Sequence, residues 1–340
     1  MTTSKREHAG PFTVTRQERV AMQTRDGVTL RADVYRPQGD GPFPVLLRRT
    51  PYGNQLNDLA EEFNEAHYLA SHGYLVVVQD TRGRFTSEGE FYPLVYEAED
   101  GYDAVEWAAT LDGGTGEVGM FGQSYGCIAQ YQAAMLRPPH LKVCVPISGW
   151  LLSFPRGSAW HSRGVLELSW VLSYLLNMAD ETLRKQGRED ELAKLDELKV
   201  DPAIRFGPLT DETLRLLPVS AWVDRLGDVV PFLADLITHE VDGPYWWWTD
   251  IRRRLDDIGV PMLHIGSWYD MATADTLAAF TALSERGATP QARAGQAVFM
   301  GPWAHLLPYN QPTSGGTGDI DFGPEASVFL LDMVREYTRT

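Results

Sequence analysis

The chain has 340 residues, of which 44% are hydrophobic, and its 30 basic and 46 acidic side chains leave a formal net charge of −16. Nucleic acids and anionic membranes are bound through clustered lysine and arginine, so this charge argues against both as partners and favours a small-molecule substrate. The length predicts one large α/β domain with an insertion, or two domains.

Two features bear on the compartment. The cysteines, Cys127 and Cys144, have no spacing typical of a zinc site or a disulfide framework, which indicates two free buried thiols in a reducing compartment. The polar start at residues 1–8 lacks the apolar segment of a secretory signal, and no run approaches eighteen apolar residues. We therefore expect a soluble, cytoplasmic protein, and the sequence leaves its oligomeric state open.

The first part of the chain alternates between strand and helix patterns. Residues 12–22 and 28–36 are β-rich and flank Asp26-Gly27, a dipeptide suited to a tight hairpin, so antiparallel strands open the chain. The apolar run at 74–78 is typical of a strand buried on both faces of a parallel sheet. Further strands are predicted at 44–48, 118–121 and 143–147, and helices at 57–71, 97–110 and 125–136. This alternation predicts a doubly wound, mostly parallel sheet.

The alternation stops between about Trp150 and Thr249. Residues 165–178 have helical patterning, and the charged run at 184–199 is expected to form a solvated helix face. For the tryptophans at 246–248 we expect a role in core packing rather than in a substrate cage. We interpret residues 150–249 as a largely helical cap inserted over the strand ends of an α/β domain made of residues 1–149 and 250–340. In the last part, strands are predicted at 261–265 and 297–300, and helices at 273–285 and 324–337.

The motif Gly122-x-Ser124-x-Gly126 has the form of a nucleophile elbow. Such an elbow places a serine on a sharp turn between a strand and a helix, and the residues two before and two after it must be small. Among 31 glycines the motif by itself is weak, and an ordinary glycine-rich turn is the alternative. Its position between a predicted strand and a predicted helix favours the elbow.

A serine needs a base to become nucleophilic, and an imidazole held by a carboxylate is the usual one. Asp270 follows the predicted strand at 261–265, and His305 follows the one at 297–300, so both lie at the sheet edge predicted for Ser124. The order Ser124, Asp270, His305 is also that of an α/β-hydrolase. The other histidines fit less well, because they lie in or beside a helix, in a strand, or after no sheet strand: His67, His72, His140, His161, His239 and His264.

Acyl transfer also requires hydrogen-bond donors for the oxyanion of its transition state. The backbone N–H of Tyr125, directly after the serine, is the expected first donor. The second is expected on the loop after the strand at 44–48, where the hydroxyl of Tyr52 is available. The alternative for Tyr52 is a packing role in a Pro/Gly loop.

Five blocks of this sequence resemble the signature blocks of the peptidase S15-type, or cocaine esterase-like (CocE/NonD), hydrolases. They are Arg49-Thr50-Pro51-Tyr52, Asp80-Thr81-Arg82-Gly83 with Ser87-Glu88-Gly89-Glu90-Phe91, Gly119-Met120-Phe121-Gly122-Gln123-Ser124-Tyr125, Gly266-Ser267-Trp268-Tyr269-Asp270 and Gly301-Pro302-Trp303-Ala304-His305. The resemblance implies an α/β-hydrolase fold with a helical cap and no metal or cofactor. It also implies Ser124 as nucleophile, His305 as base, Asp270 as its orienting partner, and the Tyr52 hydroxyl and Tyr125 amide as oxyanion hole. Asp80 and Arg82 look like scaffold.

In one respect the chain departs from that family. Its members usually continue past the last helix into a C-terminal jelly-roll domain, and this chain stops at Thr340, near where that domain would begin. We expect the jelly-roll domain to be absent, either because this is a minimal natural form or because the sequence is incomplete.

The sequence therefore predicts a serine hydrolase that cleaves carboxylic esters or amides through an acyl-enzyme. An acyltransferase and an Xaa-Pro dipeptidyl peptidase are alternatives on the same triad, and a catalytically silent binding protein is a third. A dipeptidyl peptidase needs carboxylates for the free α-amino group of its substrate. The acidic residues available for this in the cap are Glu167, Asp180, Glu181 and Asp242.

Overall fold

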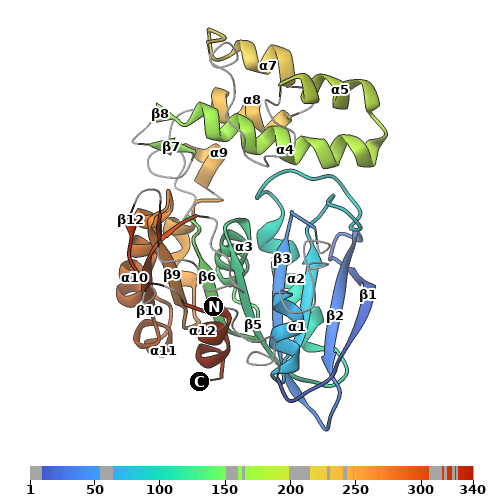
Figure 1. Cartoon of the computed structure of the whole chain (residues 1–340), viewed down its shortest axis with the longest axis vertical. Coiled ribbons are helices and arrows are strands. Elements are labelled where there is room, and N and C mark those ends of the chain that lie inside the picture. Colours follow the sequence, from blue (N-terminus) through green and yellow to red (C-terminus); the bar gives the residue numbers. More distant parts are fainter. Residues whose placement is uncertain are drawn as a thin grey trace.

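The computed structural model describes residues 10–53, 64–150, 160–162, 165–198, 215–227, 230–239, 243–247, 249–305, 316–317, 320–323, 326 and 328–339. A central sheet carries helices on both faces, and a second group of helices lies beyond one end of the sheet (Figure 1). No helix in this described part is long and apolar enough to span a bilayer.

The sheet has eight strands in the order β1-β2-β4-β3-β5-β6-β9-β10. Their bounds are β1 (Val14–Gln23), β2 (Thr29–Pro37), β3 (Phe43–Thr50), β4 (Leu75–Asp80), β5 (Gly114–Gln123), β6 (Leu141–Ile147), β9 (Leu263–Tyr269) and β10 (Ala297–Ala304). Strand β2 runs antiparallel to both β1 and β4, and the pairs from β4 to β10 are parallel. The expected doubly wound, mostly parallel sheet with an antiparallel opening is thus confirmed.

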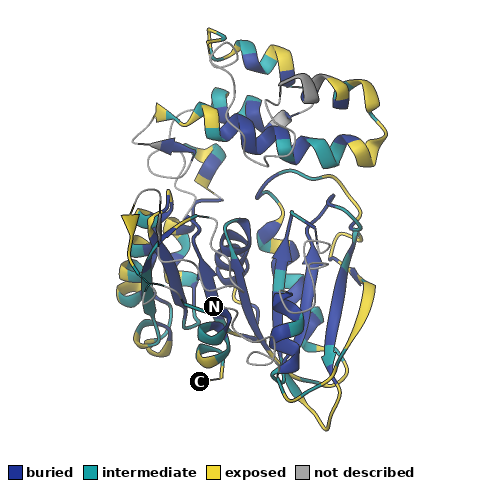
Figure 2. Cartoon of the chain, viewed as in Figure 1, coloured by how far each residue is buried: buried dark blue, intermediate teal, exposed yellow. Residues whose placement is uncertain are grey.

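Both faces of the sheet are covered. One face packs against α2 (Glu97–Ala109), α3 (Tyr125–Ala134) and α10 (Thr273–Arg286), and the other packs against α1 (Glu65–Ser71) and α12 (Leu330–Tyr337). Successive side chains of a strand point to opposite faces. Accordingly Val77 belongs to the first core and Val76 and Val78 to the second. Strand β4 is fully buried, whereas β1 at the sheet edge is largely exposed (Figure 2).

Within the described residues, the group beyond the sheet contains α4 (Leu168–Gln186), α5 (Glu189–Leu198), α7 (Ala221–Leu226), α8 (Pro231–Thr238) and α9 (Pro244–Trp247). They lie over the upper ends of the strands in Figure 1. Their apolar side chains continue the core of the sheet, because Leu172 and Leu236 belong to the same cluster as Ile128 of α3. Trp246 is buried against Phe232, as packing requires, while Trp247 is exposed.

The remaining short elements are β7 (His161–Ser162), β8 (Val165–Leu166), the 3-10 helix η3 (Ile251–Asp257), α11 (Pro290–Ala294), β11 (Gly316–Thr317) and β12 (Ile320–Asp321). Within the charged run, most described side chains between residues 184 and 193 are exposed, as expected, and Leu192 turns inward.

Several predicted boundaries are wrong. Helix α4 does not begin at residue 165, because residues 165–166 pair with β7, and it continues to Gln186, where Gly187 ends it at φ 67°. The last helix begins at Leu330, since Phe329 is extended. Strand β5 begins earlier than predicted, at Gly114. The first part of the helix predicted at 57–71, residues 57–63, lies outside the described residues.

The first hairpin forms, but its loop is longer than the tight turn that Asp26-Gly27 predicts. Its loop spans residues 24–28, where the backbone N–H and the hydroxyl of Thr24 both bond the carbonyl of Val28 at 2.9 Å. Of the two turn residues only Gly27 has a positive φ, at 87°. Asp26 instead points its carboxylate at Arg82, at 2.8 Å.

Candidate active site

Ser124 occupies a sharp turn between β5 and α3. Its φ of 56° and ψ of −117° lie outside the ordinary regions for a residue with a side chain. A Cβ on Gly122 would lie 3.3 Å from the Cα of Gly126, and a Cβ on Gly126 would lie 3.3 Å from the carbonyl oxygen of Arg49. The two glycines therefore let the turn pack closely against itself and against the end of β3.

The structure brings Ser124, Asp270 and His305 together. Nδ1 of His305 lies 2.9 Å from Oδ1 of Asp270, and Nε2 lies 3.0 Å from Oγ of Ser124. Because a carboxylate only accepts hydrogen bonds, Nδ1–H donates to Asp270 and leaves Nε2 to accept from the serine hydroxyl. Asp270 also accepts the N–H of Ala272 at 3.0 Å, which fixes its carboxylate.

Each of the three side chains comes from the carboxyl end of a parallel strand. Ser124 follows β5, Asp270 follows β9, and His305 follows β10. The Asp270 side chain is 1% exposed and that of His305 is 17% exposed. The carboxylate is thus shielded from water, and the imidazole is open enough to meet a substrate. Trp150 covers the imidazole with its ring centroid 5.9 Å away.

The two residues predicted to hold the oxyanion are also neighbours. Tyr125 is the first residue of α3, so its N–H has no acceptor within the helix. Tyr52 follows β3, and its ring meets the ring of Tyr125 edge-on at 6.4 Å. The cap reaches this point through Tyr174 of α4. Burial raises the pKa of the Tyr174 phenol well above its ordinary value, and a hydrogen bond to Tyr52 contributes to the shift.

Some residues at the site had no signal in the sequence. The side-chain amide of Gln123 donates to the backbone carbonyl of His305 and ties the histidine loop to the elbow. Trp150 and Tyr174 lie in the region 150–249, where the sequence predicted helices but not which of their side chains reach the site. Among the histidines set aside, His264 is fully buried in β9 as expected, and both cysteines are buried free thiols.

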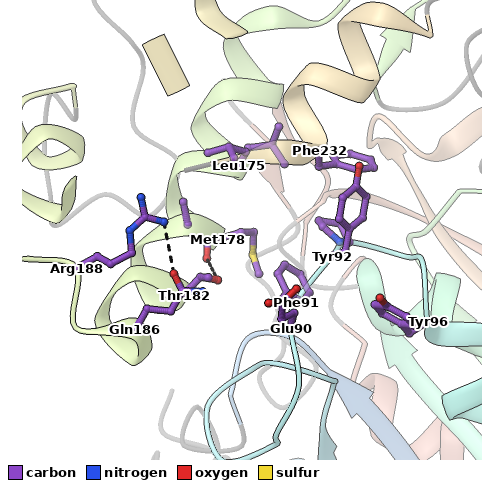
Figure 3. A pocket seen from close by; sticks show the side chains of 13 residues that line it. Glu90, Phe91, Tyr92, Tyr96, Leu175, Met178, Thr182, Gln186, Arg188 and Phe232 are labelled. Carbon is purple, nitrogen blue, oxygen red and sulfur yellow. Dashed lines mark hydrogen bonds between the residues drawn. The ribbon is translucent and has the colours of Figure 1, made fainter. Parts of the chain in front are cut away.

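A cavity of about 200 Å³ opens between the cap and the segment 90–96 (Figure 3). Apolar side chains of α4 and α8, including Leu175, Met178 and Phe232, form one wall, and Phe91 and Tyr92 form another. None of the three side chains of the Ser-His-Asp cluster lines it. Phe91 also lies 6.4 Å from the ring of Tyr125, so this wall backs onto the elbow.

Among the described residues, no group of three or more His, Cys, Asp and Glu side chains is arranged to hold a metal ion. The predicted scaffold residues have structural partners. Asp80 accepts the hydroxyl of Thr86 at 2.8 Å, and Arg82 bridges Asp26 and Asp100.

Comparison with known proteins shows which family and which individual proteins this chain is similar to. The family model of the X-Pro dipeptidyl-peptidase (S15 family) matches residues 26–307. A cocaine esterase from Rhodococcus sp. (strain MB1 Bresler) is 31% identical over 318 residues, which are 91% of this chain and 51% of the esterase.

Two solved structures share the fold at 20% identity. An α-amino acid ester hydrolase matches with a TM-score of 0.72 over 99% of this chain and 55% of its own. An aminopeptidase from a marine sediment archaeon (Thaumarchaeota) matches with a TM-score of 0.73 over 100% of this chain and 56% of its own. The chain therefore spans about half the length of the relatives it matches. With an α/β-hydrolase fold and a family match over most of its length, the chain belongs to the X-Pro dipeptidyl-peptidase (S15) family of cocaine esterase-like hydrolases.

Proposed function

We propose that this protein is a serine hydrolase that cleaves carboxylic ester or amide bonds through an acyl-enzyme intermediate. The observation that carries the proposal is the position of His305, with its two ring nitrogens at 2.9 Å from Asp270 and 3.0 Å from Ser124. This arrangement orients the imidazole and leaves Nε2 free to take a proton from the serine.

In the proposed first step, Oγ of Ser124 bonds the substrate carbonyl carbon while its proton passes to Nε2 of His305. The imidazolium then gives that proton to the leaving oxygen or nitrogen, and the bond to the leaving group breaks. In the second step, water gives a proton to His305 and attacks the acyl-enzyme, and the carboxylic acid leaves as Ser124 recovers its proton. Asp270 stabilises the imidazolium in both steps.

We assign the oxyanion to the backbone N–H of Tyr125 and the hydroxyl of Tyr52. The N–H lies in the first turn of α3, where helix N–H groups lack intrahelical acceptors and the helix dipole favours negative charge. The ring contact between Tyr52 and Tyr125 supports a shared role. Removing one such donor costs about 10²–10³ in kcat in other serine hydrolases.

The proposed substrate is a small-molecule ester or amide with an apolar group. The aromatic ring of Trp150 beside His305 favours such a group, and the names of two relatives, cocaine esterase and α-amino acid ester hydrolase, support ester bonds. The proposal also includes a cytoplasmic location and a cap made of residues 150–249 inserted between the two parts of the hydrolase domain.

We prefer this function to Xaa-Pro dipeptidyl peptidase activity, which requires a carboxylate for the substrate amine. Asp180 is paired with Arg184 at 2.6 Å, which favours a role on the helix surface. Burial raises the pKa of Glu181, while Arg84 and Lys185 beside it oppose the shift. Asp242 lies outside the described residues. The triad itself does not discriminate between water and another acceptor, so acyl transfer stays an alternative.

The test is hydrolysis of p-nitrophenyl acetate and butyrate by the whole chain and by Ser124→Ala, with an Xaa-Pro-p-nitroanilide as second substrate. We expect ester turnover that Ser124→Ala abolishes and that Ser284→Ala retains, because the hydroxyl of Ser284 bonds the carbonyl of Phe280 within α10. Anilide cleavage would move the function toward the peptidases. A folded wild type that neither turns over esters nor reacts with a fluorophosphonate at Ser124 would refute the proposal and favour a silent binding protein.

A further inference from the structure

A buried ion network lies beneath the elbow, away from the three reacting side chains. It runs from Asp26 through Arg82, Asp100 and Arg49 to Glu97. Arg82 bonds Asp100 at 2.6 and 3.0 Å and Asp26 at 2.8 and 3.0 Å, and Arg49 lies 3.9 Å from Asp100. Asp26 is half exposed, and the other end of the network is buried, with the Arg49 side chain 0% and that of Glu97 3% exposed.

Glu97 uses its two carboxylate oxygens on two different elements. Oε2 accepts from Nη1 of Arg49, and Oε1 accepts the phenol O–H of Tyr125 at 2.8 Å. Arg49 is held further by Gln79 at 2.9 Å and by the backbone carbonyl of Glu97 at 3.2 Å. The phenol of Tyr125 in turn accepts the N–H of Leu94 at 3.0 Å. Charge-assisted hydrogen bonds of this kind are short and directional, so the carboxylate defines the positions of both partners.

Both partners adjoin the proposed oxyanion hole. Arg49 is next to last in β3, three residues before Tyr52, and Tyr125 carries the proposed backbone donor directly after Ser124. The carbonyl of Arg49 also lies at the close approach of β3 to Gly126. Glu97 on α2 is therefore bonded to the strand that delivers one donor and to the residue that carries the other.

We propose that Glu97 is a positioning residue that holds the two halves of the oxyanion hole in register, through Arg49 on one side and the phenol of Tyr125 on the other. The inference rests on the proposed function. It assigns the phenol of Tyr125 a role separate from that of its backbone N–H. Because donors must meet the oxyanion within a few tenths of an ångström, loosening either half lowers the rate of acyl transfer more than it weakens substrate binding.

The test compares Tyr125→Phe with Tyr131→Phe. Both variants remove one buried phenol hydroxyl from α3, and the phenol of Tyr131 bonds His264 at 2.8 Å and the thiol of Cys127. With p-nitrophenyl butyrate we expect Tyr125→Phe to lower kcat about 10- to 100-fold with KM changed less than about threefold. Its affinity for an aryl trifluoromethyl ketone, which forms a tetrahedral adduct, should fall by the same factor as kcat. Tyr131→Phe should keep the wild-type kcat and the wild-type affinity for the ketone. Thermal unfolding measures the stability that each variant loses.

Glu97→Gln supplies the second arm. If the phenol acts through Glu97, the double variant Glu97→Gln/Tyr125→Phe has the same kcat as Glu97→Gln, whereas independent effects multiply. Asp26→Asn, at the exposed end of the network, should keep the wild-type kcat. If Glu97→Gln does not fold, the tyrosine pair decides the matter.

The outcomes separate the two proposals. A wild type without Ser124-dependent turnover or fluorophosphonate labelling overturns the proposed function, and this inference with it. An active wild type with equal kcat in Tyr125→Phe and Tyr131→Phe overturns the positioning role alone.

Discussion

His264 links the stability of this protein to pH. The imidazole is fully buried in β9 between Tyr131 and Gln296, each at 2.8 Å. The side-chain amide N–H groups of Gln296 donate to the carbonyls of Val260 and Ala292, so its oxygen must accept from Nε2–H of His264. Nδ1 then accepts the hydroxyl of Tyr131. The folded site thus binds the neutral imidazole, with Nε2–H as donor and Nδ1 as acceptor.

Burial lowers the pKa of His264 from 6.5 to about 4. Between these two values the unfolded chain binds a proton at this residue and the folded chain does not, so the free energy of unfolding falls as the pH falls from about 6.5 to 4. The contribution is fully present above pH 6.5, and the difference in pKa corresponds to about 3 kcal/mol.

The assay is urea unfolding of the wild type and of His264→Asn between pH 7.5 and 4. The variant starts less stable, because it leaves a small cavity and two altered hydrogen bonds. We expect its deficit relative to wild type to shrink by about 3 kcal/mol as the pH falls to 4. Other groups that titrate in this range cancel in the difference. Parallel curves for the two proteins, or an imidazole resonance of His264 that titrates near pH 6.5, would refute the reasoning.

Three further predictions concern the active site and the cap. Asp270→Asn should lower kcat for p-nitrophenyl butyrate about 10³- to 10⁴-fold with an unchanged fold by circular dichroism, because the imidazole loses its orienting carboxylate; a loss below tenfold would contradict the assignment. Tyr52→Phe should lower kcat about 10²- to 10³-fold with little change in KM, which steady-state kinetics would measure, and an unchanged kcat would leave Tyr52 a packing residue. Arg84→Gln should speed amide hydrogen exchange in α4 and around residue 52, because Arg84 bonds the carbonyls of Pro51 at 2.8 Å and Met178 at 2.7 Å; exchange unchanged in α4 would show that other contacts hold the cap.

The sequence predicted the sheet and its helices well because their signals are local. An apolar run such as residues 74–78 becomes a strand buried on both faces wherever a parallel sheet forms, and β4 is such a strand. The elbow was predictable for a similar reason, because the positive φ of Gly122 and the close approach between Gly122 and Gly126 favour glycine. The placement of Ser124, Asp270 and His305 followed from topology, since parallel strands end at one edge of the sheet.

Boundaries and the cap were less predictable. Residues 165–166 fit a helical pattern, and they are a strand only because residues 161–162 lie beside them. The loop around Asp26-Gly27 is longer than a two-residue turn for two reasons. The hydroxyl of Thr24 bonds the carbonyl of Val28, and the Asp26 carboxylate pairs with Arg82. In each case a contact made by folding overrode a local preference.

The sequence by itself pointed to Ser124 as the candidate nucleophile, to His305 as its candidate base and to the chemistry that we propose for them. Only the tertiary structure decided that Glu97 joins Arg49 to Tyr125 and that Tyr174 meets Tyr52. These partners lie far apart in the chain, and no sequence pattern predicts which group a buried carboxylate, arginine or phenol will bond. Burial supplies the physical reason that they pair: a polar group removed from water must find a hydrogen bond, and only the folded chain shows which one is within reach.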